Sequence, residues 1–206
     1  MKPRKKNRKK ENCIKRMFSS IKSFHFILKN LPKNLAHDLY IALYHLMGAL
    51  CEHLEYGDPF SYARSKEIYM ACKLGHDVAK TYSGEDASNI VNDEMEKYEY
   101  KSTTPGPKSK QEIKGTYSGV SVFPTWEEQE KYLRVEKIGC YKWHFYGRFE
   151  GSKLVEVWRV RGEKVLEILL PKFEKSYPDA LGKKDPRLSA TITKKEIYKH
   201  GEKVEI

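Results

Sequence analysis

The sequence predicts an α+β protein in which an N-terminal small helical bundle is followed by an antiparallel β-meander domain. Two changes along the chain support this class. Up to about residue 100, apolar residues recur every three or four positions, the spacing of amphipathic helices, whereas after about residue 117 they tend to alternate, as in strands. Between these regions, residues 101–117 are rich in Lys, Ser, Thr, Gly and Pro and hold few apolar side chains, so we expect a linker.

The first 33 residues are expected to form a basic arm and an amphipathic helix. Residues 1–16 hold nine Lys or Arg and one acid, Glu11, and supply +8 of the formal net charge of +11. Burying so dense a charge would cost far more in desolvation than it returned, so the arm should stay solvated until it meets a polyanion. Nucleic acid is the expected partner, and a tail without a binding role is the alternative. The cations assigned to this contact are Arg4, Lys5, Lys6, Arg8, Lys9, Lys10, Lys15 and Arg16.

Residues 15–31 repeat apolar side chains at helical spacing, with lysines off the stripe. A basic amphipathic helix of this kind can lie on an anionic membrane surface, enter a nucleic-acid groove or dock on its own domain, and docking is the commonest of the three. Pro32 then ends or restarts the helix.

Residues 34–100 are expected to form a three-helix bundle. A continuous leucine stripe predicts the first helix over 35–55, and the turn at 57–59 begins a second helix that runs to about Thr81. Ser83 is predicted to begin the third helix, with Asp86 as a weak capping partner in its first turn. The stripe of this third helix consists of Ala87, Val91, Met95 and Tyr98. If the first two helices are neighbours, Cys51 and Cys72 could form a disulfide bond.

Residues 118–206 are expected to form the antiparallel β domain. Thr125 and Glu128 are spaced as a capping box, which predicts a short helix to about Leu133. The predicted strands are 141–149, 154–161, 165–170, 191–198 and 203–206. The predicted two-residue hairpin turns are Gly151-Ser152, Gly162-Glu163 and His200-Gly201. Residues 171–190 are polar and contain three prolines, so we expect a long loop.

A two-residue turn at Gly151-Ser152 fixes a register for the first hairpin. In that register one face is aromatic and should belong to the core, while the other gathers cations and a tyrosine. The gathered residues are Lys142, His144, Tyr146, Arg148, Arg159 and Arg161. Basic side chains beside an aromatic on which bases stack are common in nucleic-acid-binding sheets, so this face is the second expected binding site. A solvated face without a ligand is the alternative.

Two carboxylates are the candidates for catalysis, and an enzyme is the less favoured reading. The predicted hairpins set Glu156 and Glu167 on one side of the sheet, where they could bind a divalent cation and cut phosphodiesters. Metal-dependent nucleases often use a D-x(n)-E-x-K arrangement, and we find no clear one in the predicted strands. The chain has no CxxC pair, and His37, His45 and His53 spread around their helix, so we expect no metal site and no cofactor.

These observations together predict a nucleic-acid-binding protein of low sequence specificity. A metal-dependent nuclease is one alternative, and a structural or protein-interaction module, including a homo-oligomer, is another. No transmembrane stretch or secretory signal is evident, so a cytoplasmic location is expected. The abundance of Lys and Glu with only two Gln resembles the composition of thermophile proteins.

Overall fold

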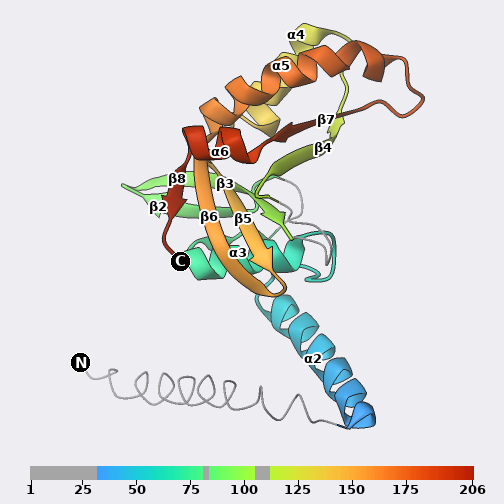
Figure 1. The fold of residues 1–206 in the computed structure, drawn as a ribbon, viewed down its shortest axis with the longest axis vertical. Coiled ribbons are helices and arrows are strands. Elements are labelled where there is room, and N and C mark those ends of the chain that lie inside the picture. Colours follow the sequence, from blue (N-terminus) through green and yellow to red (C-terminus); the bar gives the residue numbers. More distant parts are fainter. Residues whose placement is uncertain (1–31, 81–83, 105–111) are drawn as a thin grey trace. The chain divides into compact units, whose positions relative to one another are not determined.

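The structure is a computed structural model that describes residues 32–80, 84–104 and 112–206. The α+β class is confirmed, because helices and strands are both extensive (Figure 1). The basic arm and the helix predicted at 15–31 lie outside the described residues. The chain divides into two compact units, Met1–Leu50 and Cys51–Ile206. Within the described ranges, no helix has the length and apolarity needed to cross a membrane.

Helix α2 (Lys33–His53) matches the helix predicted for 35–55 and is the element described in the first unit. Its side chains are unusual for a water-facing helix, because several large apolar residues are exposed. Tyr40 is 69% and Leu46 is 65% exposed. The leucine stripe predicted from the sequence is therefore real as a pattern, but these residues do not use it to build a core.

The second unit is built on a six-stranded sheet with the order β1-β2-β3-β5-β6-β8. The strands are β1 (Asp77–Val78), β2 (Ala87–Val91), β3 (Glu94–Thr103), β5 (Trp143–Glu150), β6 (Lys153–Arg161) and β8 (Glu202–Val204). All neighbours are antiparallel except β3 and β5, which are parallel. Strands β4 (Gly115–Ser121) and β7 (Arg187–Ile192) pair separately in an antiparallel ribbon.

Two apolar cores lie on opposite faces of the six-stranded sheet. One joins α3 (Arg64–Leu74), through Met70 and Ala71, to aromatic residues of β3 and β5 such as Tyr100 and Phe145. The other joins α5 (Gly162–Leu181) and the β4–β7 ribbon to residues of β5 and β6. Figure 1 shows α5 running along this ribbon. Alternate residues of each central strand therefore enter different cores.

The third helix of the predicted bundle is wrong. Residues 87–103 form the β2–β3 hairpin, whose two central turn residues, Asn92 and Asp93, have φ of 51° and 63°. Asn and Asp tolerate this left-handed conformation, which the tight hairpin turn requires. Tyr98 and Tyr100 both enter the same core, which is the two-residue period of a strand. The described residues of 34–100 thus contribute two helices, not a bundle of three.

The predicted domain boundary at 101–117 is also absent from the fold. Strand β3 continues to Thr103, and β4 begins at Gly115. More importantly, β3 pairs with β5, so one sheet uses strands from both sides of the supposed linker. A parallel pair needs a crossover connection, and here β4, α4 (Trp126–Tyr132) and a π-helical turn (Leu133–Lys137) lie within it.

The predicted meander is replaced by helices in two places. Residues 162–181, expected to be a turn, a strand and a loop, form α5, in which Val165, Leu169, Phe173 and Tyr177 are buried at intervals of four. This burial favours a helix although Pro171 and Pro178 each remove a backbone donor. Residues expected to be the strand 191–198 instead form the end of β7 and α6 (Lys194–His200), which begins with a Thr193–Glu196 capping box.

Other sequence-based expectations are met locally. Thr125 is the N-cap of α4, and its side chain accepts a hydrogen bond from the backbone N–H of Glu128 at 3.3 Å. Gly151-Ser152 is the turn between β5 and β6. Cys51, Cys72 and Cys140 are free thiols, so the disulfide considered between the first two is not formed.

Candidate functional site

The basic sheet face predicted for β5 and β6 does not form. The pairing expected from the turn holds for two residue pairs, and then shifts by one residue between Arg148 and Phe149. A shift of one residue exchanges the faces of a strand. The shift moves Arg159 and Arg161 to the face of Trp143, where their guanidinium groups lie over its ring. His144 and Tyr146 keep the opposite face and are fully buried there, Tyr146 in the core shared with α5 and the β4–β7 ribbon.

The predicted binding cations on these strands are mostly neutralised within the protein. Arg148 forms ion pairs with Glu150 at 2.7 Å and with Glu156 at 3.0 Å. Arg159 pairs with Glu202 at 2.7 Å. Lys142 lies 3.9 Å from Glu96. The predicted arm cations, from Arg4 to Arg16, lie outside the described residues.

The two carboxylates first considered for catalysis are in structural roles. Glu156 accepts hydrogen bonds from Arg148, Trp158 and Tyr198, and these donors lower its pKa more than burial raises it. Glu167 lies on α5, where it pairs with Lys164. Since one residue is on the sheet and the other on a helix turn with its own partner, they do not form the shared site that the predicted hairpins implied.

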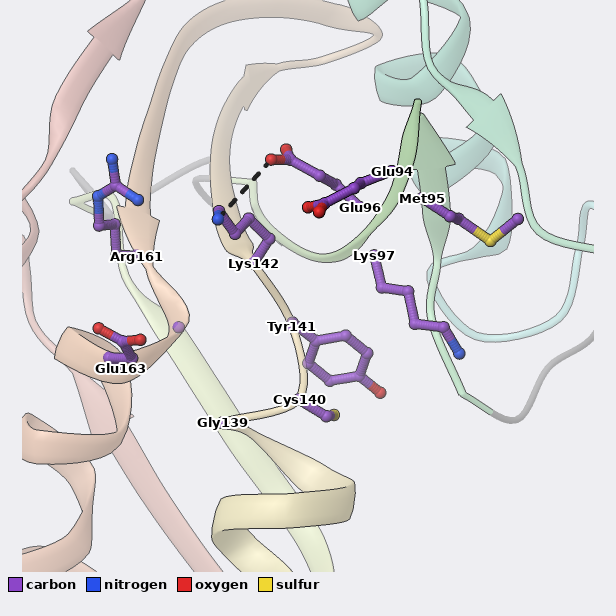
Figure 2. A pocket seen from close by; sticks show the side chains of 11 residues that line it. Glu94, Met95, Glu96, Lys97, Gly139, Cys140, Tyr141, Lys142, Arg161 and Glu163 are labelled. Carbon is purple, nitrogen blue, oxygen red and sulfur yellow. Dashed lines mark ion pairs between the residues drawn. The ribbon is translucent and has the colours of Figure 1, made fainter. Parts of the chain in front are cut away.

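A cavity of about 280 Å³ lies where β3, the segment before β5 and the start of α5 meet (Figure 2). Its charged lining residues are Glu94, Glu96, Lys97, Lys142, Arg161 and Glu163. Carboxylates and cations are equal in number, and Figure 2 shows Lys142 directed at Glu96. The wall therefore has no net charge with which to select an ionic ligand.

A different group of charges gathers at the start of β2, beside β3 and near α3. Asp86 directly precedes β2, and its N–H donates to the carbonyl of Tyr98 at 3.0 Å, which continues the β2–β3 ladder by one residue. That register puts Asp86 beside Glu99. Glu99 and Lys101 are two residues apart in β3, so their side chains leave the same face. We call Glu67, Asp86, Glu99 and Lys101 the acidic cluster.

One ion pair lies within the acidic cluster, while Asp86 and Glu67 contact partners just outside it. The Lys101 ammonium pairs with Oε1 of Glu99. Glu99 is only 7% exposed. Oδ2 of Asp86 accepts the backbone N–H of Tyr100 at 2.7 Å. Glu67, from α3, lies 3.6 Å from the guanidinium group of Arg64.

Burial and neighbouring charges shift the pKa of three residues of the acidic cluster. Burial, together with the charges of Glu99 and Glu67, raises the pKa of Asp86 to about 8. Burial also raises the pKa of Glu67, although Arg64 and Lys101 oppose it. Burial alone would lower the pKa of Lys101, but the neighbouring carboxylates raise it overall. Burial and like charge thus both oppose the ionisation of Asp86.

A buried hydrogen-bonded chain lies beside the acidic cluster. In the parallel pairing of β3 with β5, Glu99 is opposite His144 and Lys101 is opposite Tyr146. The hydroxyl of Tyr117, from β4, is 2.7 Å from Nδ1 of His144 and 2.9 Å from the hydroxyl of Tyr146. Burial lowers the pKa of His144 to about 4, so this imidazole is neutral at physiological pH.

As the side chains stand, the described part of the chain has no three His, Cys, Asp or Glu placed to hold a metal ion together. In the acidic cluster, Glu99 is already paired with Lys101. The donor set itself suits a hard cation, since Mg²⁺ and Ca²⁺ prefer carboxylate oxygens. A divalent ion on Glu99 would therefore compete with Lys101 for this carboxylate.

The acidic cluster contains the D-x(n)-E-x-K arrangement that we did not find in the sequence. Asp86 is followed by twelve residues, Glu99, one residue and Lys101. The sequence pattern predicts Asp86 in a helix cap and Lys101 in a linker, so it places neither residue in a sheet. The paired strands on either side of Asn92-Asp93 were the signal that could have revealed it.

Comparison with known proteins adds no assignment. No model of a known protein family matches the chain, and no curated protein shows significant similarity to it. The site must be interpreted from its own chemistry.

Proposed function

We propose that the protein is a divalent-metal-dependent nuclease whose active site is the acidic cluster. The observation that carries this proposal is that Asp86 and Glu99 are adjacent in the β2–β3 register, with Lys101 paired to Glu99 and the charge of Glu67 acting on Asp86. This function is the alternative considered from the sequence, with Glu156 and Glu167 replaced as the catalytic candidates. It departs from the expectation that no cofactor is needed.

The energetics of the acidic cluster favour a cation. Within the described residues Asp86 has no ion pair, and Glu99 relies on Lys101. Uncompensated charge in a low-dielectric site costs several kcal/mol, which the protein otherwise avoids by keeping Asp86 protonated. Asp86 and Glu99 are the residues that would hold the ion. When bound, such an ion polarises a phosphoryl oxygen and lowers the pKa of its water.

Lys101 has a defined part in this arrangement. Released from Glu99, its ammonium can donate hydrogen bonds to a non-bridging phosphate oxygen or to the attacking water. Both positions gain negative charge or lose a proton during phosphodiester hydrolysis, so a positioned cation stabilises the transition state. Its raised pKa keeps it charged for that purpose.

The basic arm supports nucleic acid as the substrate. Nine cations within residues 1–16 suit a phosphate polymer, and binding through phosphates gives affinity with little sequence preference. The second predicted binding site, on β5 and β6, is not part of this proposal because its cations are paired or stacked internally.

Cleavage assays with matched variants test the proposal. Labelled DNA and RNA, each single- and double-stranded, are incubated with Mg²⁺, Mn²⁺ or EDTA. We expect cleavage of at least one substrate with metal, none with EDTA, and loss of roughly a thousandfold or more in Asp86→Asn and Glu99→Gln. The control is Glu167→Gln, an exposed carboxylate with its own lysine partner, which should cleave like the wild type. Cleavage that persists in Asp86→Asn and Glu99→Gln would rule out the acidic cluster.

A further inference from the structure

We propose that Tyr117 is a positioning residue for Lys101, and that His144 and Tyr146 hold it in place. This inference rests on the proposed nuclease function, in which Lys101 acts on the scissile phosphate. It concerns a residue of β4, which contributes no charge to the acidic cluster.

The ring of Tyr117 is a platform for the lysine. The Lys101 ammonium lies 5.1 Å from the centroid of this ring, within the range of a cation–π interaction. Tyr117 is only 3% exposed, so the interaction is largely shielded from water. A lysine has four side-chain torsions and is costly to immobilise, and a fixed ring limits where its ammonium can go once Glu99 releases it.

The hydrogen bonds around Tyr117 allow one orientation. His144 Nε2 is 3.0 Å from the carbonyl oxygen of Ile138, which can only accept, so Nε2 carries the proton. Nδ1 is then the acceptor, and the Tyr117 hydroxyl donates to it. The Tyr146 hydroxyl in turn donates to the Tyr117 oxygen. Every polar atom in this chain has a partner, which fixes the ring.

Core packing alone does not explain why the hydrogen-bonded side chains of Tyr117, His144 and Tyr146 are polar. His144 and Tyr146 are 0% exposed, and removing three polar side chains from water carries a desolvation cost that apolar residues of similar size would avoid. The chain also lies directly beside Glu99 and Lys101 in the strand register, not elsewhere in the same core. Because these three side chains lie beside Glu99 and Lys101, we relate their desolvation cost to the acidic cluster.

A spectroscopic test does not depend on activity. In protein labelled with ¹³C-lysine, the Lys101 Cε–H signal is identified by its absence in Lys101→Arg. We expect an upfield ring-current shift in the wild type that remains in Tyr117→Phe and disappears in Tyr117→Leu. A wild-type signal at the position of solvent-exposed lysines would overturn the inference.

A kinetic test follows the same residues under single-turnover conditions. We expect the rate constant to fall roughly tenfold in Tyr117→Leu and less in Tyr117→Phe, with unchanged KM and Mn²⁺ affinity. The control is Tyr177→Phe, which removes another hydroxyl from the same core, one that donates to the carbonyl of Phe123. If Tyr117→Leu, folded at the assay temperature, cuts at the wild-type rate while Asp86→Asn does not cut, Tyr117 has no positioning role and the nuclease assignment stands. If Asp86→Asn and Glu99→Gln also cut normally, the nuclease assignment falls, and the ring-current shift still decides whether Tyr117 holds Lys101.

Discussion

Two charged regions of one sheet differ in how their charges are balanced. On β5 and β6 the cations that first suggested a binding surface have carboxylate partners or, for Arg161, an aromatic ring. In the acidic cluster, at the start of β2, burial and the charges of Glu99 and Glu67 raise the pKa of Asp86 to about 8. The first region is neutralised within the fold, whereas the second retains an electrostatic cost that a ligand could relieve.

This difference indicates which charged region is better suited to bind a ligand. Exposed ion pairs contribute little to stability, and their charges are already balanced without a ligand. Buried groups that shift one another's pKa are costly, and they concentrate at sites that bind or react. Counting cations along the sequence indicated the β5–β6 hairpin because it could not show which of them are paired within the protein.

Replacing one lysine in each region should give the largest difference. We expect Lys101→Ala to lower the cleavage rate constant roughly 10²- to 10³-fold, the usual cost of removing one group that stabilises transition-state charge. Lys142→Ala removes a half-exposed lysine 3.9 Å from its partner and should stay within about twofold of the wild type. Equal losses in the two variants, measured by single-turnover kinetics, would erase the distinction between the regions.

The pH dependence of stability tests whether His144, beside the acidic cluster, is buried as a neutral imidazole. Since burial lowers the pKa of His144 to about 4, the unfolded state binds more protons between that value and about 6.5. The free energy of unfolding should therefore fall by about 3 kcal/mol from this residue as pH is lowered from 6.5 towards 4. Denaturant unfolding of the wild type and of His144→Gln, which lacks this titration, measures the difference. Identical pH profiles would show that His144 is not buried as a neutral base.

Removing the arm should weaken binding without touching catalysis. If about half of its nine cations contact phosphates, log K falls with log[salt] at a slope near −4 on duplex DNA. Deletion of residues 1–16 should remove most of this salt dependence. Affinity in dilute buffer should fall roughly tenfold or more. Arg159→Ala, whose guanidinium is paired with Glu202, should leave the slope unchanged. The reverse result would return the binding role to β5 and β6.

Local sequence signals predicted several elements correctly. The leucine stripe gave α2, the Thr125 cap gave the start of α4, and Gly151-Ser152 gave a hairpin turn. In each case a few neighbouring residues determine the structure through capping, turn geometry or a long apolar repeat.

The failures arose where distant residues decide. Ala87, Val91 and Met95 are spaced as on a helix, but pairing with a neighbouring strand makes this segment a hairpin. The register shift after Arg148 exchanges two faces and has no local signature in the sequence. The acidic cluster depends on that hairpin and on α3, so its residues could be seen in the sequence but not brought together.

Calorimetric titration with Mn²⁺ tests the central claim most directly, because it requires no knowledge of the substrate. The account predicts that the wild-type protein binds Mn²⁺ and that Asp86→Asn and Glu99→Gln lose this binding, while Glu156→Gln retains it. A wild-type protein that binds no divalent cation, or variants of the acidic cluster that bind it as tightly as the wild type, would contradict the account.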